Sequence, residues 1–108
     1  MYFKIPKSFE LMNDTINIKY SDKLTSEEDS NGRAYYRKKL IELQKISETN
    51  NLNEDNLIKT YLHELLHMIL WKLEEDKLRT DEKLINKMAW LLAQHFKSAK
   101  YNLFKNDN

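Results

Sequence analysis

The sequence contains no cysteine in its 108 residues. This absence excludes disulfide bonds and thiolate metal sites, and it fits a reducing compartment. Long hydrophobic runs are also missing, because the longest one, Met68 to Trp71, is far too short to span a bilayer. The first residues, Met1 to Pro6, lack the apolar core of a signal peptide. We therefore expect a cytoplasmic protein without a membrane partner.

No charge of one sign dominates, since 18 basic and 17 acidic residues give a net charge of +1. This balance gives no argument for a nucleic-acid partner. Hydrophobic residues make up 41% of the chain, which is too many for a disordered protein. The length suits one domain over residues 1–108, with flexible tails at 1–7 and 102–108. A domain of this size has a small margin of stability, so a bound metal would also support the fold.

The first half of the chain has the alternating pattern of strands. A hairpin with one buried face and a turn at Asn13-Asp14 is predicted from Phe9, Leu11, Ile16, Ile18 and Tyr20. Polar residues 21–31 predict a loop. The only glycine, Gly32, precedes a possible second pair, Ala34–Arg37 and Leu40–Gln44. Nothing between these two segments favours a tight turn, so a bent or continuous strand is the alternative.

The second half predicts helices. Asn53, which ends a polar linker over residues 47–53, is a plausible N-cap. Apolar residues lie almost all round the helix from Leu57 to Leu73, which is typical of a helix buried on most sides. A charged connection follows, and Thr80 or Asp81 can cap a second helix. The residues that recur at helical spacing in this second helix are Leu84, Met88, Leu91, His95 and Ala99.

His63 and His67 are four residues apart on the first of these helices. This spacing places both imidazoles on one face, one turn apart, where two nitrogens can bind one Zn²⁺ at about 2.0–2.1 Å. Glu64 lies about 100° round the helix from His63, where it can take a proton from a zinc-activated water and pass it to a leaving amine. A chance pair of histidines on an amphipathic helix is the alternative. A metal site is favoured because the HExxH pattern lies on a predicted helix and uses two of the only three histidines in the chain.

Catalytic zinc needs a third protein ligand. Glu82 is the preferred candidate, because it lies in the first turn of the next helix after the chain reverses, although an acidic helix start is common. Asn86 shares the face of Glu82 and can hydrogen-bond the outer nitrogen of a histidine ligand. Glu74 lies about 10 Å along the helix from His67 and is too far away. The rival ligands are His95 and, more weakly, Asp76 and Asp81.

The segments Tyr61–Leu70 and Asp81–Asn86 resemble the gluzincin branch of the zincin metallopeptidases. In that branch HExxH is joined by a glutamate from a following helix, often as Glu-x-x-x-Asp, and here asparagine replaces the aspartate. The layout also resembles small phage and prophage metallopeptidases related to the ImmA/IrrE and SprT-like groups. SprT-like enzymes use a third histidine, and none follows His67 at a suitable distance. The resemblance implies a cytoplasmic enzyme of a bacterium or a phage-infected host cell.

The same resemblance implies an α+β fold, in which a small, largely antiparallel sheet packs on the active-site helix and on a second, ligand-bearing helix. It implies a zinc endopeptidase that acts on a peptide or protein. The extended substrate would add as a strand to an exposed sheet edge, which we place at Lys39–Gln44. The alternatives are a phage or prophage regulatory zinc protein that binds a host or repressor protein without cleaving it, and a zinc hydrolase of a non-peptide amide. The sequence does not choose among the tyrosines that can donate to an oxyanion, which are Tyr35, Tyr36, Tyr61 and Tyr101.

Overall fold

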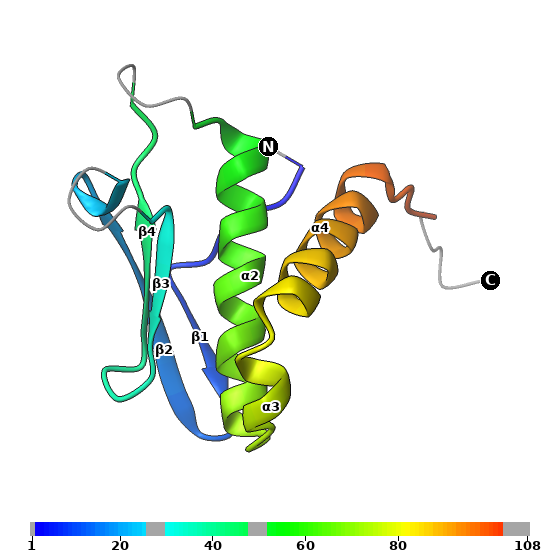
Figure 1. The fold of residues 1–108 in the computed structure, drawn as a ribbon. Coiled ribbons are helices and arrows are strands. Elements are labelled where there is room, and N and C mark those ends of the chain that lie inside the picture. The colour runs from blue at the N-terminus through cyan, green and yellow to red at the C-terminus, as the bar shows by residue number, and fades with distance from the viewer. Residues whose placement is uncertain (1, 26–29, 48–51, 103–108) are drawn as a thin grey trace.

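The computed structural model describes residues 2–25, 30–47 and 52–102. Parts of the predicted loop and linker, at 26–29 and 48–51, lie outside the described residues, as does the end of the C-terminal tail at 103–108. The described chain has an α+β fold with a four-stranded mixed sheet and three helices. The strands are β1 (Ser8–Leu11), β2 (Asp14–Ser21), β3 (Gly32–Tyr35) and β4 (Leu40–Gln44), and the helices are α2 (Glu54–Lys72), α3 (Asp76–Arg79) and α4 (Glu82–Ser98). Figure 1 shows that α2 lies between the sheet and α4.

The predicted hairpin of β1 and β2 is confirmed. Its two strands pair antiparallel, with Leu11 opposite Asp14. The connecting residues, Met12 and Asn13, have φ angles of 46° and 71°, as a two-residue hairpin turn of the primed type requires. The turn therefore lies one residue earlier than predicted, because Asp14 already begins β2.

The sheet has the strand order β1-β2-β4-β3. Two of its pairings are antiparallel, but β2 and β4 run parallel, so the sheet is mixed. The segment between β3 and β4 forms a turn in which the Lys39 backbone N–H donates to the Tyr36 carbonyl oxygen at 3.1 Å. Lys39 has a φ angle of 52° there. The alternative of a continuous strand is therefore wrong.

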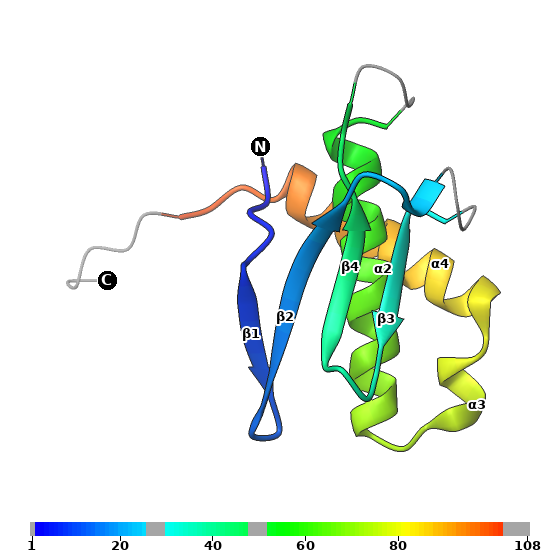
Figure 2. The same cartoon turned by 90° about the vertical axis from the view of Figure 1, so that its left-hand side faces the viewer.

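The predicted substrate edge at Lys39–Gln44 is also wrong, because β4 pairs with β2 on one side and with β3 on the other. The edge strand on the side of α3 and α4 is β3 (Figure 2). The alternation of apolar and polar residues does not show the order of strands in a sheet. That order depends here on the parallel pairing of β2 with β4, which are joined by a long connection.

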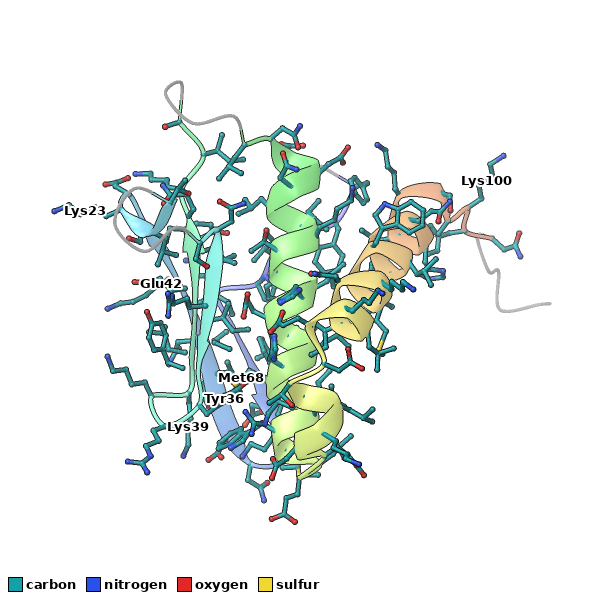
Figure 3. All side chains as sticks on the ribbon, in the orientation of Figure 1. Lys23, Tyr36, Lys39, Glu42, Met68 and Lys100 are labelled. Atoms are coloured by element: carbon teal, nitrogen blue, oxygen red, sulfur yellow. The ribbon has the colours of Figure 1, made fainter. Side chains whose placement is uncertain are left out.

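Helix α2 begins where predicted. The Asn53 side chain accepts from the Asn56 backbone N–H at 2.9 Å, and the Asn56 side chain accepts from Asn53, which completes a reciprocal cap. Helix α2 contacts β3 and β4 on one side and α4 on the other, which explains its apolar residues all round. Met68 is fully buried and lies between α2 and the sheet (Figure 3).

The N-terminal segment, which we predicted to be a flexible tail, packs against the core through Tyr2, Phe3 and Ile5. The Phe3 ring lies 5.9 Å from that of Tyr61 and 4.7 Å from that of Phe96. Apolar contacts of this kind hold residues 2–5 in place. No helix in the described ranges has the length and apolar character needed to cross a membrane.

The charged connection contains the one-turn helix α3, which the sequence analysis missed. Asp81 is the N-cap of α4, and its side chain accepts from the Leu84 backbone N–H at 3.1 Å. The predicted apolar stripe of α4 is partly wrong, since Leu91 and His95 are exposed. The buried residues are Ile85, Ala89 and Ala93, two of which are small enough to let α4 approach α2 closely.

Candidate metal centre

Three predicted ligands meet at one point beside α2. His63 and His67 lie one turn apart, and their Nε2 atoms are 3.1 Å apart. Glu82 is the first residue of α4 and reaches both rings, with Oε2 3.0 Å from His63 Nε2 and Oε1 3.0 Å from His67 Nε2. The one-turn helix α3 reverses the chain and so returns Glu82 to the helix that it has just left. One potential ligand atom from each of the three residues lies within 4.8 Å of the others, so this group can hold a metal ion.

The donor set fits a tetrahedral metal. Ligand atoms at 2.0–2.1 Å from a tetrahedral zinc are separated from one another by roughly 3.3 Å, close to the distances found here. Hydrogen bonds alone do not satisfy the group. With an ionised Glu82, each of its two contacts needs a proton on a histidine Nε2, whereas the contact between His63 and His67 needs one Nε2 without a proton. A cation shared by three lone pairs removes this conflict.

Burial favours the neutral form of His67, which can bind a metal. The side chain is 10% exposed, and its desolvation lowers the pKa of His67, helped by the nearby His63 and opposed by the Glu82 carboxylate. The imidazole is therefore neutral near pH 7, which is the form that ligates a metal. Glu82 differs, because its side chain is 61% exposed and leaves this side of the group open to solvent.

Glu64 lies beside the group without joining it. Its Oε2 is 4.0 Å from His63 Nε2, and the residue is only 7% exposed. Burial and the Glu82 carboxylate raise the pKa of Glu64 to about 7, and Arg33 partly opposes the shift. A carboxyl group with this pKa exchanges protons readily at neutral pH. A cation held by the three ligands would lower this pKa again.

His67 has partners besides the other two members of the group. The Tyr36 hydroxyl lies 3.4 Å from His67 Nδ1, and a backbone hydrogen bond with Arg79 also acts on the imidazole. Tyr36 is itself held, since its ring stacks on Trp71 at 5.4 Å and the Arg79 guanidinium lies 5.1 Å above it. Figure 3 shows Tyr36 beside the lower end of α2, where the turn after β3 brings it.

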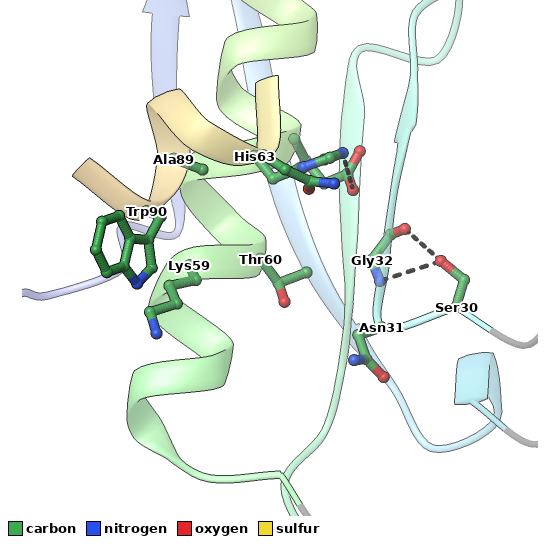
Figure 4. Close-up of a pocket in the computed structure, with 10 residues that line it drawn as sticks. Ser30, Asn31, Gly32, Lys59, Thr60, His63, Ala89 and Trp90 are labelled. Carbon is green, nitrogen blue, oxygen red and sulfur yellow. Dashed lines mark hydrogen bonds and ion pairs between the residues drawn. The ribbon is translucent and has the colours of Figure 1, made fainter. Parts of the chain in front are cut away.

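Two adjoining cavities flank the group. One, of about 300 Å³, lies over α2 towards Trp90 (Figure 4), and the other, of about 410 Å³, extends towards Tyr36. Both are lined by Ser30, Gly32, His63 and Glu64, so together they form a groove along β3 and α2.

Gly32 allows β3 to approach α2 this closely. A Cβ atom at Gly32 would lie 2.5 Å from Thr60 Cγ2 and 3.3 Å from Glu64 Cγ. Any side chain there would therefore push β3 away from the helix that carries Glu64.

The other predicted candidates do not belong to the group of three. His95 is exposed near the end of α4 and packs edge-on against Phe96. Asp76 pairs with Arg79 in α3, and Asp81 caps α4. Asn86 lines the cavity towards Trp90, so its predicted role in orienting a histidine stays a prediction.

The structure separates the four tyrosines. Tyr61 is 3% exposed, and burial raises its pKa to about 12, as expected of a packing residue. Tyr101 is 78% exposed near the end of the described chain. Tyr35 and Tyr36 line the groove, where Tyr35 donates to Glu42 at 3.3 Å and Tyr36 contacts His67.

Among the groove residues that were not predicted from the sequence, three carry a charged or aromatic side chain. Lys59 and Trp90 line the cavity over α2, and Arg33 lines the other. A signal existed for Lys59 alone, since it precedes His63 by four residues and so shares its side of the helix. Arg33 and Trp90 come from elements whose position relative to α2 depends on tertiary packing.

No protein-family model, curated protein or solved structure matches this chain significantly. The function is therefore inferred from the geometry of the metal centre and its groove.

Proposed function

We propose that this protein is a zinc-dependent metallopeptidase that cleaves peptide bonds within a chain. The observation that supports this proposal most strongly is the buried Glu64 next to a group of three potential metal ligands. Two imidazoles and one carboxylate form a donor set that zinc accepts, and three protein ligands leave a fourth position open. When bound, zinc supplies Lewis acidity, which lowers the pKa of water towards 7 and polarises a carbonyl group.

Glu64 is the general base of the proposed reaction. Its carboxylate accepts a proton from the attacking water and then donates it to the leaving nitrogen, so that one residue serves both steps. The position fits, because Glu64 lines both cavities and approaches His63 Nε2 at 4.0 Å without being one of the three grouped ligands. A protein that only bound metal would not need a buried carboxyl group there.

The groove suits an extended peptide. The Gln44 backbone N–H donates to the Asn31 carbonyl oxygen at 2.8 Å, so the alternation of an antiparallel pair directs the backbone of Gly32 and Ala34 away from β4. Ser30 covers this edge at Gly32, where its hydroxyl donates to the carbonyl oxygen at 2.6 Å. A substrate strand can pair with Ala34 and replace Ser30 at Gly32, which would hold its backbone beside Glu64.

The proposal is tested with the purified chain and an unfolded protein substrate. We expect about one zinc ion per chain by mass spectrometry of the metal, and internal cleavage products by mass spectrometry of the substrate. Dialysis against a chelator should stop cleavage, and one equivalent of zinc should restore it. A zinc-loaded chain that binds unfolded substrate without cutting it would instead support the regulatory alternative. Cleavage that continues in chelator would contradict both.

A further inference from the structure

Lys59 is a cation of the groove that forms no direct ion pair among the described residues, although it acts on Asp55 electrostatically. It is half-buried on α2 and lines the cavity that His63 and Glu64 also line. Within the described ranges its ammonium group has no hydrogen bond or ion pair, whereas Lys39, Lys72 and Lys97 each contact an aspartate. The nearest acidic neighbour on the helix, Asp55, is held by Lys97 at 3.0 Å. Half-burying a lysine without an ion pair has a cost that a bound anion can offset.

The rest of this cavity suits an organic anion. Away from the metal ligands and Glu64, the lining residues that the structure describes include no acidic side chain. Asn86 contributes an amide that can donate a hydrogen bond, and Trp90, which is 54% exposed, contributes an apolar surface. Figure 4 shows Lys59 and Trp90 side by side at the end of the cavity remote from Ser30. A carboxylate on a short apolar stem matches all three groups.

The distance fits a peptide. Lys59 precedes His63 by one turn of α2, or about 6 Å along the helix axis. An extended peptide advances about 3.3 Å per residue, so Lys59 lies about two residues from a bond held at the metal centre. We propose that Lys59, with Asn86 and Trp90, forms a subsite that selects substrates carrying a carboxylate at this distance from the cleaved bond. This inference rests on the proposed function.

A carboxylate at this position has two sources, an acidic side chain or the C-terminus of the substrate. Short peptides that carry a hydroxamate at the N-terminal end separate them, because the hydroxamate binds zinc whether or not the protein cleaves peptides. We would compare three compounds of equal length that end in alanine with a free carboxylate, in aspartate amide, and in asparagine amide. Their affinities for the zinc-loaded chain are measured by calorimetry, beside a separate assay of peptide cleavage.

We expect at least one carboxylate compound to bind roughly tenfold more tightly than the asparagine amide, since a charge-assisted hydrogen bond contributes on this scale. Lys59→Gln should abolish this difference, and Lys59→Glu should reverse it. Lys87→Gln and Lys87→Glu are matched controls, because Lys87 is exposed on α4 and does not line the cavity. The carboxylate compound that binds more tightly shows whether the subsite takes an acidic side chain or the C-terminus of the substrate.

Equal binding of all three compounds to the zinc-loaded wild type would overturn the subsite, as would a preference that survives in Lys59→Gln. Binding of none of them would overturn it as well. A carboxylate preference that depends on Lys59, together with no cleavage of any peptide, would contradict the proposed peptidase function but not the subsite. Zinc content and melting temperature of each variant show whether a lost preference comes from a damaged fold.

Discussion

The hydroxyl group of Tyr36 lies 3.4 Å from Nδ1 of His67, on the opposite side of the imidazole from Nε2. A neutral histidine that ligates through Nε2 carries its proton on Nδ1, which can then donate to the tyrosine oxygen. Such outer contacts fix the ring and strengthen the ligand. Tyr36 reaches this position from the turn after β3, so a residue that follows the sheet edge contacts a candidate ligand on α2.

Tyr36→Phe should therefore weaken zinc binding while the ring stays stacked on Trp71. Loss of an outer partner commonly lowers metal affinity 10- to 100-fold, and we expect about tenfold here, because the backbone hydrogen bond with Arg79 remains. Chelator competition measures the change. Tyr35→Phe is the control, since its hydroxyl contacts Glu42 and not a ligand. Equal affinities of the two variants would show that Tyr36 does not position His67.

Removal of any one grouped ligand should abolish tight zinc binding. His63→Ala, His67→Ala and Glu82→Ala are each expected to lose the melting-temperature increase that saturating zinc gives the wild type, an effect of about 4 kcal/mol at a thousandfold excess over Kd. His95→Ala should keep that increase, because His95 is exposed and distant from the group. Loss of the zinc response in His95→Ala alone would place the metal elsewhere.

Glu64→Gln separates catalysis from metal binding. The amide keeps the shape of the side chain but cannot accept a proton, so cleavage should fall by about 10²- to 10⁴-fold while zinc content is unchanged. The rate of product formation and the zinc-to-protein ratio are measured on the same sample. Glu10→Gln, an exposed change on β1, controls for the altered charge. Undiminished cleavage in Glu64→Gln would remove Glu64 from the mechanism.

Gly32→Ala should destabilise the protein by about 1–3 kcal/mol, as overpacking of a tight contact usually does. The added Cβ atom would meet Thr60 Cγ2 at 2.5 Å. Thr60→Ser removes that methyl group, so the double variant should recover most of the loss in a denaturant titration. Additive destabilisation by the two changes would mean that the contact with Thr60 does not cause the effect.

Asp14 should make stability depend on pH in the acid range. Hydrogen bonds with Lys39 and then Lys72 lower the pKa of Asp14 from its ordinary value of 3.8. A carboxyl group whose pKa is lower in the folded state stabilises the protein fully above its pKa in the unfolded state. This stabilisation is lost as the pH falls through the pKa of the folded state. The melting temperature of Asp14→Asn should therefore lie below that of the wild type at pH 6, and the gap should begin to narrow below about pH 4.

The exposed Asp22 provides the comparison for this pH series. Asp22→Asn should match the wild type throughout the range. A gap between Asp14→Asn and the wild type that stays constant down to pH 2 would show that Asp14 acts through its shape and not through its charge.

Local patterns in the sequence predicted the features that depend on neighbouring residues. The spacing of His63 and His67 follows from 3.6 residues per helical turn, and the caps at Asn53 and Asp81 follow from hydrogen bonds within a few residues. The first hairpin is local as well, because its turn joins adjacent strands. The preference for Glu82 needed one more step, the chain reversal at the charged connection.

Tertiary structure alone decided the features that depend on distant segments. The parallel pairing of β2 with β4 places β4 inside the sheet and makes β3 the edge, which strand alternation does not encode. The face of α4 that is buried was settled by the fit of Ala89 and Ala93 to α2, although Leu91 is more apolar. Tyr36, Arg33 and Trp90 reach the groove in the same way, because the groove exists only where β3, α2 and α4 meet.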